Sequence, residues 1–104
     1  MDTLSRLSET IAARRSADPA TSWVARLHAQ GLPLIARKLG EEAVETVVAA
    51  LSGTRAELIA EAADTMFHLL VLLDAKDVPL AEVLAELERR EGGSGIAEKA
   101  ARDQ

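Results

Sequence analysis

Residues 37–51 read RKLGEEAVETVVAAL and residues 57–73 read ELIAEAADTMFHLLVLL, and these two stretches decide the fold. In both, apolar residues recur three and four positions apart, which is the spacing of one face of an α-helix. The short segment 52–54, SGT, separates the two predicted helices, so they can fold back on each other as a helical hairpin. The chemistry that the sequence predicts is also carried by these two helices.

Four acidic residues form two pairs on the predicted hairpin, Glu42 with Glu45 and Glu61 with Asp64. Residues three apart project from the same helix face, so the hairpin can bring all four carboxylates together. Such a set of oxygen ligands suits Mg²⁺, with Mn²⁺ as an alternative. A solvated acidic face with chance spacing is the competing interpretation, and the spacing alone does not separate the two.

The segment that follows the second pair favours the metal interpretation. Residues 66–73, MFHLLVLL, are apolar on all sides of the helix except at His68, so this part of the helix is expected to be buried all round, in the interior or in a homodimer interface that it helps to bury. Glu61 and Asp64 then lead into buried surface, where an unpaired carboxylate is costly and a divalent cation removes that cost. These two acids are therefore expected on the buried side of the site, with the other pair facing the substrate.

Neighbouring residues extend the predicted site. Lys38 shares the helix face of the acids and has Arg37 beside it, so both can contact phosphate oxygens; an ion pair between Lys38 and Glu42 is the equally weighted alternative. His68, one turn after Asp64, is interpreted either as a hydrogen-bonded core residue, the commoner case, or as a residue behind the ligands that orients the Asp64 carboxylate.

The rest of the chain predicts further helices around the hairpin. Helical spacing follows Thr3, which is interpreted as an N-cap, and begins again after Thr21 or Ser22. In this second helix Trp23 and Leu27 are expected to be buried one turn apart.

We therefore expect an all-α helical bundle of about four to five helices over residues 1–92, followed by a mobile C-terminal tail over residues 93–104. A chain of 104 residues can form a core but leaves apolar surface for a partner, so homodimerisation is expected to complete the bundle.

The composition excludes several function classes. No cysteine is present, which excludes disulfides and thiolate chemistry. The N-terminus lacks the apolar region of a signal peptide, and no stretch reaches the roughly 18 apolar residues of a membrane span, so a cytoplasmic protein without membrane contact is expected. A formal net charge of -5 argues against nonspecific nucleic-acid binding, but it allows a polyanionic small substrate if metal ions supply positive charge.

The pattern EExxE at residues 41–45, followed by ExxD at residues 61–64, resembles the MazG-like all-α nucleoside triphosphate pyrophosphohydrolases. Three further segments narrow the resemblance to the phosphoribosyl-ATP pyrophosphatase family: SWVARLHAQG at 22–31, RKLGEEAVE at 37–45 and SGIAEKAAR at 94–102. The resemblance covers nearly the whole chain. The chain differs from the usual pattern of that family at a few positions, none of them in the acidic motif. Asp77, for example, stands where that family often has glycine.

The resemblance implies a magnesium-dependent enzyme that hydrolyses phosphoribosyl-ATP to phosphoribosyl-AMP and pyrophosphate, the second step of histidine biosynthesis. The implied site has metal ligands at Glu42, Glu45, Glu61 and Asp64, catalytic acids at Glu41 and Glu45, and a phosphate contact at Lys38 with Arg37 beside it. Two alternatives remain open. One is a house-cleaning pyrophosphatase that acts on free nucleoside triphosphates, and the other is a non-catalytic helical dimerisation module whose acids are only a solvated face.

Overall fold

The computed structural model describes residues 2–92 and 95–102, and within these ranges the chain forms helices and no strands. The helices are α1 (Thr3–Arg14), α2 (Trp23–Gln30), α3 (Leu32–Ser52), α4 (Arg55–Ala75), α5 (Leu80–Glu91) and α6 (Gly95–Arg102). The predicted all-α class is confirmed. Helix α6 lies in the segment that was predicted as a mobile tail, and the predicted domain boundary at residue 92 stays a prediction.

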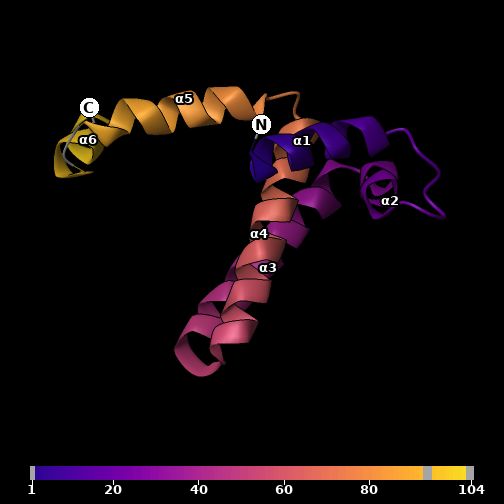
Figure 1. The fold of residues 1–104 in the computed structure, drawn as a ribbon, viewed down its shortest axis with the longest axis horizontal. Helices are drawn as coiled ribbons and strands as arrows, with labels where there is room; N and C mark the ends of the chain where they lie inside the picture. Colours follow the sequence, from indigo (N-terminus) through magenta and orange to yellow (C-terminus); the bar gives the residue numbers. More distant parts are fainter. Residues whose placement is uncertain (1, 93–94, 103–104) are drawn as a thin grey trace.

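The predicted hairpin is the longest feature of the fold. Helices α3 and α4 run antiparallel side by side, and α1 and α2 pack at the end where α3 begins and α4 ends (Figure 1). Helix α5 leaves this end in another direction and carries α6 away from the hairpin (Figure 1). None of the described helices is long and apolar enough to cross a membrane.

Side-chain caps start three of the helices. Ser22 and Thr54 each accept the backbone N–H of the third residue along, as N-caps do. The prediction that Thr3 caps the first helix is wrong, because Asp2 takes that position and its carboxylate accepts the Ser5 N–H at 2.8 Å. An aspartate is also the better cap, since its charge interacts favourably with the helix N-terminus.

The turn between α4 and α5 depends on Asp77, which has a φ of 56°. In this left-handed region a short polar side chain is tolerated better than a bulky one, which explains why a residue other than glycine can stand here. The Val78 N–H donates to the Leu73 carbonyl at 2.9 Å, and the Arg15 guanidinium donates to the Asp77 carboxylate at 3.1 Å. These contacts set the direction in which α5 leaves the hairpin.

The core is small and lies at the open end of the hairpin, opposite its connecting turn, where α1, α2, α3 and α4 meet. Its buried residues are Ile11, Val24, Leu27, Ile35, Leu70 and Val71. One expectation fails here: Trp23 is 45% exposed rather than buried, because α2 turns Leu27 and not Trp23 into the core. Within the single chain the segment 66–73 is buried only in part, since Met66 is 46% exposed and Leu69 is also exposed. Its burial in a homodimer interface stays a prediction.

The single chain exposes more surface than a compact monomer of its mass. Its accessible surface is 7143 Å², whereas about 5,700 Å² is expected for an 11.1 kDa monomer. Its radius of gyration is 15.7 Å, against about 13 Å for a compact domain of this length. The excess includes a continuous apolar stripe on α3, formed by Val44, Val47, Val48 and Leu51. We refer to these four residues as the α3 stripe.

Candidate functional site

Three of the four predicted metal ligands meet where α3 and α4 lie side by side. One carboxylate oxygen each from Glu42, Glu45 and Glu61 lies within 4.8 Å of the other two. We refer to these three residues as the carboxylate cluster. Asp64, one turn after Glu61, is exposed and is not part of this group, although its charge contributes to raising the pKa of Glu42. The hairpin therefore brings both acidic pairs to one place, with Asp64 at its margin.

The cluster contains carboxylate oxygens that lack partners. The Oε2 atoms of Glu42 and Glu61 are buried and make no hydrogen bond to any described residue. Desolvation, followed by the neighbouring Glu45, raises the pKa of Glu61 to about 7, and the same two causes raise the pKa of Glu42. The expected division into a buried α4 pair and an exposed α3 pair is wrong. Each helix contributes one half-buried acid and one exposed acid, because the seam between the helices lies nearest Glu42 and Glu61.

The raised pKa of Glu61 predicts that the stability of the metal-free protein depends on pH. The folded, metal-free chain keeps a proton on Glu61 up to about pH 7, whereas the unfolded chain releases it near 4.5. Because the folded state binds more protons in this window, stability must fall as the pH rises through it. We expect the Tm of EDTA-treated protein to fall between these pH values, and Glu61→Gln to remove much of the fall. An equal decline in both proteins, measured by circular dichroism, would contradict the prediction. The comparison also separates the effect of Glu61 from that of His28. The lowered pKa of His28 makes stability rise, rather than fall, as the pH increases.

A pair of hydroxyl groups beside the cluster was not predicted. The Oγ1 atoms of Thr46 and Thr65 lie 2.8 Å apart, linking α3 to α4. Each hydroxyl also lies near the carbonyl oxygen four residues back, that of Glu42 at 2.9 Å and that of Glu61 at 3.0 Å. The sequence does contain one feature that points to this pair: on each helix a threonine stands four residues after an acid of the cluster. The pair fixes the spacing of the helices one turn from the carboxylates.

We expect Thr65→Val and Thr46→Val each to lower the free energy of unfolding by about 1 kcal/mol, the usual value of a partly buried hydrogen bond. Because the two residues share one contact, the double variant should lose less than the sum of the singles. Urea unfolding of the four proteins measures this coupling. Strictly additive losses would mean that the hydroxyl contact contributes nothing to the pairing of α3 with α4.

The predicted phosphate contacts lie at the edge of the cluster and are held by Glu41. Arg37 Nε is 3.3 Å from Glu41 Oε1, and Lys38 Nζ is 3.7 Å from Glu41 Oε2. Lys38 therefore pairs with Glu41 and not with Glu42, the alternative that the sequence left open. Both ion pairs are solvent-accessible and so contribute at most about 1 kcal/mol, which leaves the cations free to exchange Glu41 for a phosphate.

His68 has the features of a core residue. It is only 6% exposed, and its ring meets the Phe67 ring edge-on at a centroid distance of 5.2 Å. Its Nδ1 lies 2.7 Å from the backbone carbonyl oxygen of Asp64, so Nδ1 carries the hydrogen and donates it. His68 thus contacts the main chain of Asp64 rather than its carboxylate, which favours the core interpretation.

A cavity of about 300 Å³ opens beside the cluster, toward the tip of the hairpin. It is lined by Glu45, Val48, Ala49, Ser52, Gly53, Glu57 and Glu61. On the other side of Glu45 a shallow apolar depression is lined by Arg37, Gly40, Glu41 and Val44. The cluster therefore has accessible space on both sides, one acidic and one next to the two cations.

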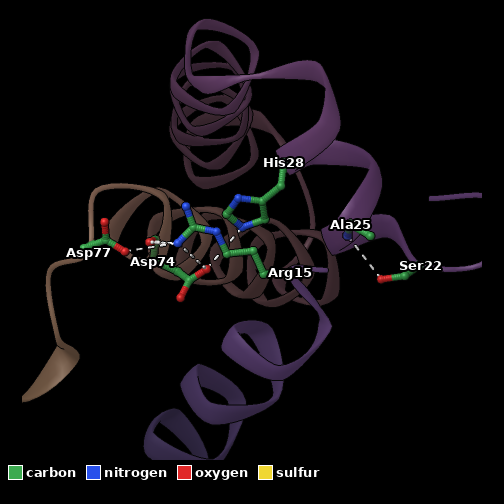
Figure 2. Close-up of polar contacts among 6 residues, drawn as sticks. All are labelled: Arg15, Ser22, Ala25, His28, Asp74 and Asp77. Atoms are coloured by element: carbon green, nitrogen blue, oxygen red, sulfur yellow. Dashed lines mark hydrogen bonds and ion pairs between the residues drawn. The ribbon is translucent and has the colours of Figure 1, made fainter. Parts of the chain in front are cut away.

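A second polar group ties helices together at the open end of the hairpin (Figure 2). His28 Nε2 lies 3.2 Å from Asp74 Oδ2, and the Arg15 guanidinium donates to the Asp74 carbonyl oxygen at 3.0 Å as well as to Asp77. The side chain of His28 is only 10% exposed, so this contact lies largely inside the fold. This group ties α1 and α2 to the end of α4 and lies apart from the carboxylate cluster.

Comparison with known proteins points to one family, through a family model and through similar proteins. The family model described as phosphoribosyl-ATP pyrophosphohydrolase matches residues 4–91. A protein of Novosphingobium aromaticivorans named phosphoribosyl-ATP pyrophosphatase is 68% identical, over 95% of this chain and 92% of its own length. Proteins of the same name from Rhizorhabdus wittichii and Erythrobacter litoralis are 66% and 65% identical, over 96% and 98% of this chain and 94% and 98% of their own lengths.

Proposed function

The chain belongs to the phosphoribosyl-ATP pyrophosphohydrolase family, and we propose that it hydrolyses phosphoribosyl-ATP to phosphoribosyl-AMP and pyrophosphate, as a step of histidine biosynthesis. The observation that carries this proposal is the carboxylate cluster, whose three acids from two helices approach within 4.8 Å. A solvated acidic face would keep such like charges apart. The non-catalytic alternative is therefore the weaker one.

We propose Mg²⁺ as the cofactor, with Mn²⁺ able to replace it, held by the cluster and completed by Asp64. The donor set fits, because all its atoms are carboxylate oxygens, and two of them, on Glu42 and Glu61, are buried without partners. When bound, the ion would supply positive charge to the phosphates and to the leaving pyrophosphate. Removal of the ion should lower the Tm of the protein as well as its activity.

Proton transfer and phosphate binding are then assigned to residues in and beside the cluster. Glu45 is exposed and borders both the cavity and the shallow depression. We therefore assign Glu45 the role of general base, which accepts the proton of the attacking water. As the water oxygen bonds to phosphorus, the α-β anhydride bond breaks and pyrophosphate leaves. Glu41 holds Arg37 and Lys38 at the edge, where they can bind phosphate oxygens and orient the chain of phosphates.

A substrate panel tests this function against the house-cleaning alternative. With Mg²⁺, we expect kcat/KM for phosphoribosyl-ATP to exceed that for ATP, dATP, dCTP and dUTP by at least about 100-fold, because the added phosphoribosyl group supplies contacts that free nucleotides lack. Equal or faster turnover of a free triphosphate would favour the house-cleaning enzyme instead. Glu45→Gln is the matched inactive control.

We further propose that the enzyme is a homodimer that buries the α3 stripe. Its residues follow the spacing of one helix face, and Leu51 is 83% exposed in the single chain. Ile59 and Met66 extend the exposed apolar surface onto α4. The surface excess of the single chain is of the size that a stable homodimer interface requires. The cytoplasmic location and the absence of nucleic-acid binding, both expected from the sequence, stay predictions.

A further inference from the structure

The site in a single chain is short of positive charge for its proposed substrate. A polyphosphate must approach the carboxylate cluster, and the two cations beside it, Arg37 and Lys38, both have Glu41 as their partner. One divalent ion offsets only part of this negative charge. Arg37 and Lys38 can serve one edge of the cluster, but the described residues that line the cavity on the other side of Glu45 include no cation. Additional cations that meet the phosphates there are therefore needed.

Helix α6 offers two further cations, which lie apart from the carboxylate cluster in the described part of the chain. Lys99 and Arg102 lie in its last turn, are exposed, and are three residues apart, so they project from one face. In its own chain α6 lies at the far end of α5, well away from the paired part of α3 and α4 (Figure 1).

The arm formed by α5 and α6 is held in this direction at its base. Asp77 fixes the turn with its left-handed backbone and its contact with Arg15, and the latter also binds the end of α4 (Figure 2). Leu80, the first residue of α5, packs on the core. These contacts hold α5 in the direction in which it leaves the hairpin. The apolar face of the arm also stays partly uncovered, since Leu87 is exposed.

We propose that in the homodimer the α5–α6 arm of one copy lies against the hairpin of the other, placing Lys99 and Arg102 beside the partner's carboxylate cluster to bind the phosphates of the substrate. The inference rests on the proposed function and on the proposed dimer. The partner is a second copy because the exposed apolar surface of α3 and α4 adjoins the cluster: Val48 lines the cavity together with Glu45. An arm that crosses this interface therefore reaches a site of the other chain.

Kinetics of a variant with Lys99→Ser and Arg102→Ser tests the contact itself. Loss of charge-assisted contacts should raise KM for phosphoribosyl-ATP by about 10- to 100-fold with a smaller change in kcat. Lys99→Arg with Arg102→Lys keeps both charges and should restore most of the affinity. Arg14→Ser with Lys76→Ser removes the same net charge elsewhere and should leave KM unchanged. An unaltered KM in the first variant overturns the proposal.

Mixed dimers test whether the arm acts on the other chain. The arm variant and Glu45→Gln are co-expressed with different affinity tags, and dimers carrying both tags are isolated. If the arm acts on the partner, each mixed dimer has one complete site and about half of the wild-type activity. If the arm acts on its own chain, the mixed dimer is no more active than the arm variant, and the proposal is overturned. Failure to recover any dimer that carries both tags overturns it as well, because the arm then has no partner chain to act on. An inactive wild-type protein would instead refute the proposed function on which the inference rests.

Discussion

Glu61→Gln is expected to lower kcat/KM for phosphoribosyl-ATP by on the order of 10³-fold. The change keeps the size of the side chain but removes the charge from one of the two carboxylates that have a buried oxygen without a partner. The same variant should also lose the rise in Tm that Mg²⁺ gives the wild type. Its metal-free stability should be equal or higher, since the raised pKa of Glu61 shows that its charge is unfavourable in the folded state.

Glu57→Gln is the matched control for this prediction. Glu57 is four residues earlier on α4 and lines the same cavity, but it is not part of the carboxylate cluster. It should keep the Mg²⁺-dependent rise in Tm and most of the activity. If both variants lose the metal response equally, the ion binds elsewhere on α4. If neither loses it, the cluster does not hold the ion.

Val47→Glu is expected to convert the dimer to a monomer. Val47 lies in the middle of the α3 stripe, and a two-fold interface would bury two new carboxylates without partners. At micromolar concentration, sedimentation should show a particle of about twice the 11.1 kDa chain mass for the wild type and of one chain mass for the variant. Activity should fall as well, because the arm can then no longer reach a second copy.

Ala13→Glu provides the control for added charge, since this exposed position on α1 lies outside the stripe and should leave the dimer intact. A wild-type chain that sediments as a monomer at micromolar concentration would refute the proposed interface. The excess surface and the exposed stripe would then need another explanation.

The hairpin and the carboxylate cluster could be predicted because both depend on local spacing. Apolar residues three and four apart define each helix face, and the same spacing places Glu42 with Glu45. Short-range rules also placed the start of the second helix at Thr21 or Ser22, and Ser22 is its N-cap in the structure. At the N-terminus the same rules chose Thr3 over Asp2, because adjacent residues were both acceptable caps and only the geometry of the first turn distinguishes them.

What the sequence did not predict depends on how the helices face one another. The contact of Thr46 with Thr65 requires the register between α3 and α4, and the contact of His28 with Asp74 joins residues far apart in the chain. The exposure of Met66 has the same origin: periodicity shows that a face is apolar but not whether its own chain or another covers it. For that reason the division of the acids into buried and exposed members was also missed.

The most direct test of the proposed function is product analysis with phosphoribosyl-ATP and purified wild-type protein. With Mg²⁺ present, phosphoribosyl-AMP and pyrophosphate should appear in equal amounts, and EDTA should stop the reaction. Release of inorganic phosphate in place of pyrophosphate, or no product at all in the presence of Mg²⁺, would contradict the account.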